Sequence, residues 1–309
     1  RAEACRLHVA MLVMREKLDA AFRVGVQGLS ELGVRVPLDE TLWRAALEQE
    51  RVAIEDKLDG RPIRSLVSSP RVEDPVIVTT MSLLLDLSAP AFLSSIAATR
   101  LVAAVLVRLS IEYGNSEASA YGFAAHGFFL AAETKQLDEA HAFGDLSLAL
   151  EDEFGAGQLA CRVRLVAGSM LHTKRARRVA LFHFQKAVEL AAGAGELFYV
   201  ARAAGQAMAA RFELADDISR ACEDTERSLT IVRAAMGARA ISDASVLLTL
   251  QAARCLLGKT RDRTNLSDET FDADEYVQSR LRVGDTFAGL WASYLRIQIS
   301  ILQEEFTSA

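Results

Sequence analysis

Proline is absent from most of this 309-residue chain. All five prolines lie before residue 91, and none follows as far as residue 309. Because proline breaks helix interiors, the proline-free part can form long helices joined by short turns. Glycines divide it into segments of about 40 residues, which is close to the length of one helical hairpin in repeat proteins.

Cysteine motifs, excess basic charge and uninterrupted apolar runs are also lacking. The four cysteines lie far apart without CxxC spacing, so we expect buried thiols in a reducing, cytoplasmic compartment rather than disulfides or a metal site. The net charge of −6 argues against non-specific nucleic-acid binding, which needs an excess of Lys and Arg. The longest apolar stretch, 76–93, is interrupted by Asp86 and Pro90, and it therefore predicts two buried helical segments rather than a membrane span.

Helical patterning is what the sequence does have. Ala, Leu, Arg and Glu dominate, and these residues favour helices. Apolar residues recur at i, i+3, i+4 and i+7, which is the period of an amphipathic helix. Two examples are Ala142, Leu146, Ala149, Leu150 and Phe154, and Ala180, Phe184, Ala187, Val188 and Ala191. No alternating run indicates a strand, so the sequence predicts an all-α fold.

Small residues also repeat along the chain. A small residue followed seven positions later by another, and then by an apolar one, occurs at Ala21/Gly28-Leu29, Ala142/Ala149-Leu150, Ala180/Ala187-Val188 and Ala221/Ser228-Leu229. Gly127, Gly168 and Gly205 precede the later three on the expected partner helices. Hairpin repeats place small residues where helix backbones approach closely. We therefore predict a right-handed, tetratricopeptide-like α-solenoid of about seven helical hairpins, with an irregular helical bundle as the alternative.

We expect a single helical-repeat domain over residues 1–309. Its three parts are residues 1–90, which are less regular, residues 91–237, with regular hairpins, and residues 238–309, with C-terminal helices. The first part holds a long loop at 58–75, packed along one side of the stack. The last part holds a polar loop at 258–284, whose acidic composition indicates flexibility. The chain begins at Arg1 rather than Met, and we expect it to be a segment of a longer protein.

The tripeptide Gly258-Lys259-Thr260 matches the end of a phosphate-binding P-loop. That motif needs an earlier glycine where this chain has Ala253, and a strand where residues 245–257 resemble a helix. We therefore interpret Gly258 as the glycine that follows a helix, with Lys259 near the negative end of the helix dipole.

Titratable residues show no catalytic pattern. The five histidines lack the i, i+4 spacing of a metal site, and His141 with Asp145 indicates a surface pair on one helix. Asp216 and Asp217 stand between two expected helices and are interpreted as a helix cap. We expect no catalytic residue, no cofactor and no metal, and an all-α enzyme is the remote alternative.

The remaining candidate is a surface. In a solenoid the first helix of each hairpin lines the concave side, and counting from the three glycines selects the side chains that lie there. They are Tyr121, Arg162, Ser169, His172, Tyr199, Arg202 and Gln206. Binding surfaces favour aromatic and Arg residues, so these are candidate binding residues. The alternative is that they are ordinary packed or solvated residues.

Three longer stretches carry a Leu-Gly-x-x-x-Pro, an Arg-Pro-Ile, and a Tyr-Gly-Asn-Ser before a Tyr-Gly-x-Ala, in that order. They are GLSELGVRVPLDET (28–41), LDGRPIRSLVSSPRVEDP (58–75) and IEYGNSEASAYGFAAHGFFLA (111–131). In order and spacing, over residues 15–210, they resemble the helical region of very large bacterial signalling proteins. In those proteins a Ser/Thr-kinase-like domain and a STAND-type, AAA-like ATPase precede the helical repeats, and a GAF domain and often a histidine kinase follow.

The resemblance implies a segment downstream of the ATPase that carries none of these activities itself. In STAND proteins the helical repeats sense an inducer or partner and hold the ATPase inactive until it binds. We therefore expect a non-catalytic module that docks a protein partner or other domains of its own chain, or holds those domains inactive. The alternative is a small-molecule inducer sensor, with the ligand enclosed by the superhelix. A second copy of the chain is a further candidate partner, whereas nucleic acid and membrane are not.

Overall fold

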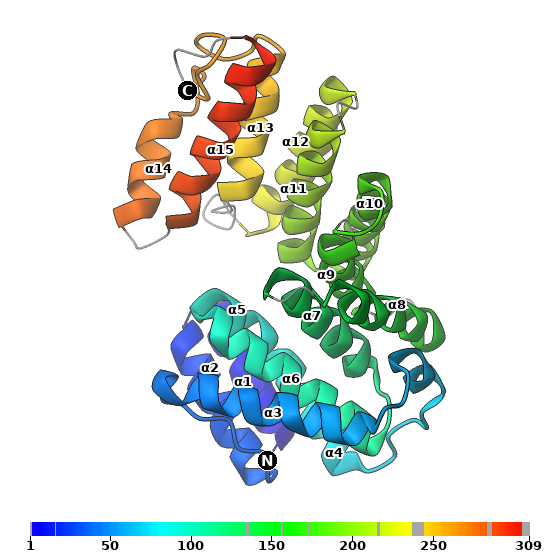
Figure 1. Ribbon diagram of the computed structural model, residues 1–309. Helices are drawn as coiled ribbons and strands as arrows, with labels where there is room; N and C mark the ends of the chain where they lie inside the picture. Colours follow the sequence, from blue (N-terminus) through cyan, green and yellow to red (C-terminus); the bar gives the residue numbers. More distant parts are fainter. Residues whose placement is uncertain are drawn as a thin grey trace. The chain divides into compact units, whose positions relative to one another are not determined.

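The computed structural model describes residues 2–15, 17–133, 136–155, 157, 159–171, 173–214, 217–236, 244–282 and 286–304. Within these ranges the regular secondary structure is helical and no strand is present. One isolated β-bridge joins Arg71 and Asn115. The all-α prediction is confirmed. The chain divides into two compact units, residues 1–174 and 175–309 (Figure 1).

The described part of the first unit holds nine α-helices and two short 3-10 helices. In chain order they are α1 (Ala2–Met14), α2 (Leu18–Glu31), η1 (Glu40–Leu42), α3 (Trp43–Leu58), η2 (Ile63–Ser68), α4 (Pro75–Asp86), α5 (Ser88–Ser94), α6 (Ile96–Tyr113), α7 (Glu117–Glu133), α8 (Leu137–Phe154) and α9 (Ala160–Leu171). Among the first six α-helices, contacts between consecutive helices are mixed with contacts between helices distant in the chain, such as α3 with α6 and α2 with α5, whereas α7, α8 and α9 pack on one another in sequence. The N-terminal part is therefore the less regular one.

The core of this unit is formed by α6 and α7, which are apolar on nearly every face. A helix that is hydrophobic all round must be buried, and α6 is covered by α3, α4, α5 and α7. Phe123 on α7 stacks on Phe143 of α8 with ring centroids 5.8 Å apart, and both rings are fully buried. Each such side chain contributes about 2–3 kcal/mol through burial.

Gly127 lets α7 and α8 approach closely, as the repeat pattern predicts. A Cβ at this position would lie 2.7 Å from the carbonyl oxygen of Ala140. The face that α8 buries differs from the expected one, because Ala149 is exposed and Ala142 is half-buried. The buried small residues of α8 are Ala140, Gly144 and Ser147. Alanine occurs on both faces of α8, so the apolar pattern alone did not determine its register.

The apolar stretch Pro75–Phe92 is the one described segment that is long and apolar enough to cross a membrane, and half of it is buried inside the protein. It is divided between α4 and α5, as its interruptions predict. Asp74 caps α4 by accepting a hydrogen bond from the Val76 N–H at 2.8 Å, and Pro75 occupies the first helical position. The stretch therefore has the form of two core helices.

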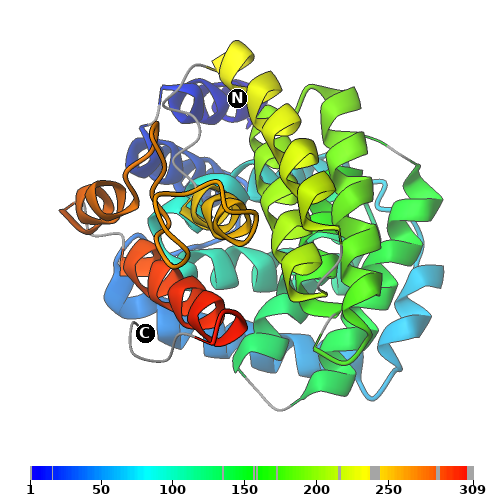
Figure 2. The same ribbon diagram turned by 90° about the horizontal axis from the view of Figure 1, so that it is seen from above.

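The described part of the second unit holds six helices. They are α10 (Arg177–Ala194), α11 (Leu197–Glu213), α12 (Ile218–Met236), α13 (Ala244–Leu256), α14 (Ala273–Arg282) and α15 (Thr286–Leu302). Figure 2 shows these helices from above. Consecutive helices pack in pairs, and α11 also packs on α13, which in turn packs on α15. Contacts between alternate helices are what stacked hairpins produce.

Residue spacing on α10 predicted its buried face. Ala180, Phe184, Ala187 and Ala191 are buried, and Val188 of the same set is half-buried. Gly205 of α11 is also a site of close approach, but its neighbour is Val246 of α13 rather than a residue of α12. Gly205 therefore allows close contact between the alternate helices α11 and α13, whereas the repeat pattern predicted contact within one hairpin.

The acidic stretch at 258–284, predicted as a flexible loop, contains a helix and a hydrogen-bonded segment in the structure. Its last part forms α14, and the 257–272 segment before that helix is closed by hydrogen bonds. Asp262, Asp268 and Asp272 each accept bonds from two backbone N–H groups that follow them. Leu266 is fully buried at its centre. The aspartates serve as turn and helix caps, which composition alone does not reveal.

Candidate functional site

The candidate residues from the sequence fall in both units. Arg162 lies on α9 of the first unit and is half-buried, and Ser169 on the same helix donates its hydroxyl to the carbonyl of Leu165. Arg202 and Gln206 lie on α11 of the second unit, one turn apart and half-buried. His172 lies outside the described residues.

The two tyrosines differ from the expectation. Tyr121 on α7 and Tyr199 on α11 are both buried, with less than a tenth of each side chain exposed. A tyrosine at close helix packing contributes its ring to the core, and so neither residue presents a ring on an open surface.

A charged hollow of about 580 Å³ surrounds Arg162. One face of α4 lines it, together with α1, the start of α7, the end of α8 and the start of α9. Its charged side chains are Arg6, Arg71, Asp86, Glu117 and Arg162. These residues come from five separate segments, and only Arg162 was selected from the sequence.

An ion pair forms part of the lining of the charged hollow. Arg6 donates to Asp86 at 2.7 Å, joining α1 to α4. Burial raises the pKa of the Asp86 carboxyl, and the hydrogen bond from Arg6 and the charge of Arg162 oppose that effect. Asp86 therefore pairs with Arg6, and the positive charge of Arg162 also favours its ionised form.

Arg71 lies at the rim of the hollow. Its guanidinium carbon is 4.6 Å from the centre of the Phe154 ring, and Glu153 is 3.7 Å away. The Arg71 side chain is largely exposed, so this ion pair contributes little to stability. A cation held over an aromatic ring at an open edge can still contact a ligand.

Asn115 positions this rim. Its side chain donates to the carbonyl of Leu66 at 2.7 Å, and its backbone pairs with Pro70 and Val72. These contacts fasten the 59–74 segment onto the junction of α6 and α7. Two of the stretches that carry the family resemblance, around 58–75 and 111–131, are therefore in direct contact.

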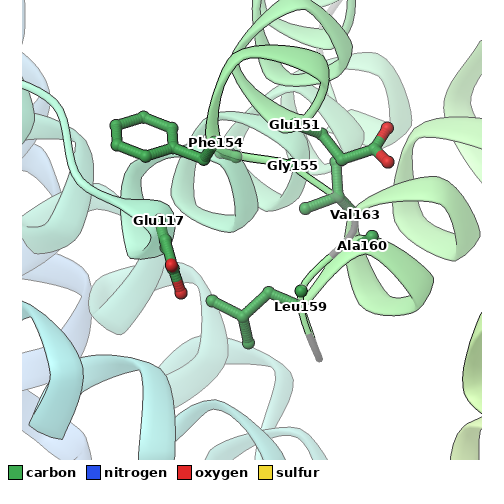
Figure 3. Close-up of a pocket in the computed structure, with 9 residues that line it drawn as sticks. Glu117, Glu151, Phe154, Gly155, Leu159, Ala160 and Val163 are labelled. Carbon is green, nitrogen blue, oxygen red and sulfur yellow. The ribbon is translucent and has the colours of Figure 1, made fainter. Parts of the chain in front are cut away.

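A small cavity of about 10 Å³ adjoins the hollow (Figure 3). Glu117, Phe154 and Leu159 line both spaces. Figure 3 shows the carboxylate of Glu151 on the far side from these three residues, where it pairs with Arg164 at 2.7 Å. The cavity has room for about one water molecule, and so it is a packing gap rather than a ligand site.

A second depression, the α2–α3 groove, was not predicted. Its volume is about 840 Å³, and it forms because α2 packs on α1 and α5 whereas α3 packs on α6. Val26 and Val36 are buried at its base, while Leu38 and Leu42 are about half exposed on its wall. The Trp43 indole N–H donates to the Pro37 carbonyl at 2.7 Å and fixes the end of the connecting segment.

Charge in the α2–α3 groove is of one sign. Arg23 and Arg35 are its charged lining residues, and both are exposed. No aspartate or glutamate lines the groove, whose residues all lie in the described range 17–133. The exposed Asp39 and Glu40 lie between Leu38 and Leu42 in the chain but do not line the groove, so its positive charge is confined to the lining itself.

The second unit has an apolar surface of its own, the α15 stripe. It consists of Leu290, Tyr294, Ile297 and Ile301, which are all exposed. Their spacing of four, three and four residues places them on one face of α15. A row of exposed apolar side chains on one face of a helix is typical of a contact surface.

The remaining sequence motifs have structural roles. Gly258 follows α13 with φ +68°, and Lys259 and Gly258 donate backbone bonds to Arg254 and Cys255, as in a Schellman motif. Asp217 caps α12 through the Arg220 N–H, and Asp216 lies outside the described residues. His141 bonds Thr173 at 3.0 Å.

Cysteine and acid clusters also have defined places. All four cysteines are free thiols, of which Cys161, Cys222 and Cys255 are buried and Cys5 is half-buried. In the part of the chain that the structure describes, no group of three or more His, Cys, Asp or Glu side chains is arranged to hold a metal ion.

Comparison of this chain with models of protein families, with curated proteins and with solved structures gives no match. Function is therefore argued from the surfaces described above.

Proposed function

We propose that this protein is a non-catalytic docking module, in which stacked helices present surfaces to a protein partner or to other domains of the same chain. The observation that carries the proposal is the α2–α3 groove, which leaves Leu38 and Leu42 about half exposed. Open apolar surface of this kind favours association, because covering it removes apolar area from water. The α15 stripe supports the same role in the second unit.

The regulatory part of the proposal is an extension of the family resemblance. In a STAND-type signalling protein, a docked partner would bias an equilibrium between inactive and active arrangements of the attached domains. The bias equals the difference in the partner's affinity for the two states, and the helical module supplies the contact surface.

Affinity capture with paired variants tests the docking function. Leu38→Ser with Leu42→Ser alters the groove, and Leu290→Ser with Ile297→Ser alters the α15 stripe. All four side chains are exposed, so folding should be preserved, and circular dichroism checks this. Docking predicts a specific protein that the wild-type chain retains and that one of the two variants loses. Equal retention by the wild type and both variants contradicts docking at these surfaces.

A small-molecule sensor is the second candidate, and the charged hollow favours it. Its volume of about 580 Å³ is in the usual range for ligand pockets, and it places the guanidinium groups of Arg6, Arg71 and Arg162 beside Asp86 and Glu117. Such a mixture of charges suits a ligand with both anionic and cationic groups. Co-purification of a small molecule that Arg162→Ala abolishes would support this candidate. Arg164→Ala, next along α9 but paired with Glu151, is the matched control.

A further inference from the structure

We infer that the α2–α3 groove binds an amphipathic helix whose apolar side chains enter the groove and whose flanking residues are acidic. The inference rests on the proposed docking function and adds the class of partner. It depends on three features of the groove: its shape, its apolar lining and the sign of its charge.

Shape favours a helix. Along α2 the groove is bordered by Arg23, Gln27 and Ser30, at positions i, i+4 and i+7. The opposite border runs seven positions along the chain, from Leu42 at the end of η1 to Gln49 on α3. Two helix faces of this length give a trough of about 10 Å, which matches two turns of a third helix laid between them.

The lining determines which face of the partner enters. Val26 and Val36 form an apolar base, and Leu38 and Leu42 offer exposed methyl groups above it. Because these groups line a hollow, they can enclose inserted side chains from both sides. A membrane surface would instead require apolar groups that protrude. An inserted leucine or phenylalanine is thus the fitting anchor.

Charge determines what flanks that face. Arg23 and Arg35 belong to α2 and to the segment that follows it, and no acidic side chain lines the groove between them. A carboxylate on the partner can therefore pair with either guanidinium without repulsion from the lining. Arginine also binds carboxylates in a two-pronged geometry, which favours acidic partners over neutral ones.

Two synthetic helical peptides of about 15 residues, long enough to form a helix, test the inference. Both carry the same leucine face, and one has glutamate and the other lysine at the flanking positions. Binding to the whole chain is measured by fluorescence anisotropy at low and at moderate salt. The net charge of −6 attracts the lysine peptide non-specifically. A preference for glutamate can therefore arise only from a local positive site.

We expect the glutamate peptide to bind about tenfold more tightly at low salt, with the preference shrinking as salt rises. Arg23→Ala with Arg35→Ala should abolish the preference for glutamate. Leu38→Ser with Leu42→Ser should weaken the binding of both peptides. Arg44→Ala is the matched control, because Arg44 is an exposed arginine on α3 that does not line the groove. Equal binding of the two peptides, or tighter binding of the lysine peptide, overturns the inference.

Two other outcomes also overturn it. Sedimentation could show a dimer of the chain that Leu38→Ser with Leu42→Ser converts to a monomer, and the occupant is then a second copy. Alternatively, vesicles of anionic phospholipid could bind in a groove-dependent manner while the glutamate peptide does not. If the peptides fail but affinity capture still depends on Leu38 and Leu42, the docking function stands and only the acidic class of partner is wrong.

Discussion

In the first unit the 59–74 segment is closed onto α6 and α7 by uncharged groups, whereas in the second unit the 257–272 segment is closed by ionised aspartates. Asn115 pairs with Pro70, Val72 and Leu66 in the first case. In the second, Asp268 accepts bonds from Arg254 and Gln251 and from two backbone N–H groups. Both arrangements provide hydrogen-bond partners for backbone groups of a long connecting segment.

The same contrast extends to the titratable groups of each unit. Burial lowers the pKa of His126 in the first unit to about 4, and the charges of Arg51 and Arg100 act in the same direction. Burial alone would raise the pKa of Asp268 in the second unit, but hydrogen bonds from Gln251 and from backbone N–H groups outweigh it and lower that pKa to about 2. Acid should therefore weaken the two units in different pH ranges.

The two tryptophans allow each unit to be observed separately. Trp43 is in the first unit and Trp291 is in the second, and these are the chain's two tryptophans. Trp291→Phe leaves a fluorescence signal from the first unit, and Trp43→Phe leaves one from the second. The following predictions use urea unfolding of the whole chain in these two backgrounds.

The largest effect is expected from Gly114→Ala. Gly114 ends α6 with φ +113°, and an added Cβ would overlap the carbonyl oxygen of Pro70 in the 59–74 segment. Gly155→Ala is the matched control, because Gly155 ends α8 with φ +88° and an added Cβ would meet no atom within 4 Å. We expect a loss of unfolding free energy of about 4 kcal/mol for Gly114→Ala and about 2 kcal/mol for the control. Equal losses would show that close contact between Gly114 and the 59–74 segment does not contribute to stability.

His126 should make the first unit sensitive to mild acid. Its folded pKa of about 4 lies below the ordinary value of 6.5, so the unfolded chain binds more protons between these values. Stability is then fully present above pH 6.5 and is lost as pH falls toward 4. The difference in pKa corresponds to about 3 kcal/mol at most.

His126→Gln removes the titrating group and should flatten this pH dependence in the Trp43 signal. His8→Gln is the matched control and should leave the pH dependence intact, because His8 is exposed on α1. An unchanged pH profile in His126→Gln would contradict the role of the buried imidazole.

Asp268→Asn should weaken the second unit by about 2 kcal/mol at neutral pH. The pKa of Asp268 is about 2 in place of 3.8, so the ionised form is stabilised above pH 3.8 and that stability is lost as pH falls toward 2. Asparagine keeps an acceptor for the turn but loses the charge that pairs with Arg254. The Trp291 signal of the variant should therefore lose its pH dependence in this range. A variant as stable as the parent would contradict closure by ionised aspartate.

The smallest effect is expected where the two segments are alike. Gly60 and Gly258 begin them with φ +71° and φ +68°, and an added Cβ at either position would meet no atom within 4 Å. Gly60→Ala and Gly258→Ala should each lower stability by about 1 kcal/mol, through backbone strain alone. A much larger effect at one of them would show that the segments already differ at their first turn.

The helices were predictable from the sequence because their signals are local. The absence of proline after residue 90, the apolar period and the glycines that follow helices each act within a few turns. Gly258 illustrates this, since its neighbours alone predicted the helix end. The register of α8 was not predictable, because Ala142 and Ala149 resemble core residues as much as Ala140 does.

The surfaces were not predictable because they depend on distant residues. Arg6, Asp86 and Arg162 meet in the charged hollow although they lie far apart in the chain. The α2–α3 groove exists only because each of its two helices packs on another neighbour. The acidic 257–272 segment was predicted to be flexible because composition does not show that its aspartates cap backbone N–H groups.

Native mass spectrometry of the chain, purified directly from its expression host, tests the docking function most directly. Docking predicts a chain without a small molecule, and docking of an acidic helix in the α2–α3 groove further predicts a one-to-one complex with the glutamate peptide that is lost in Leu38→Ser with Leu42→Ser. A near-stoichiometric small-molecule mass that disappears in Arg162→Ala would contradict it and assign the function to the charged hollow.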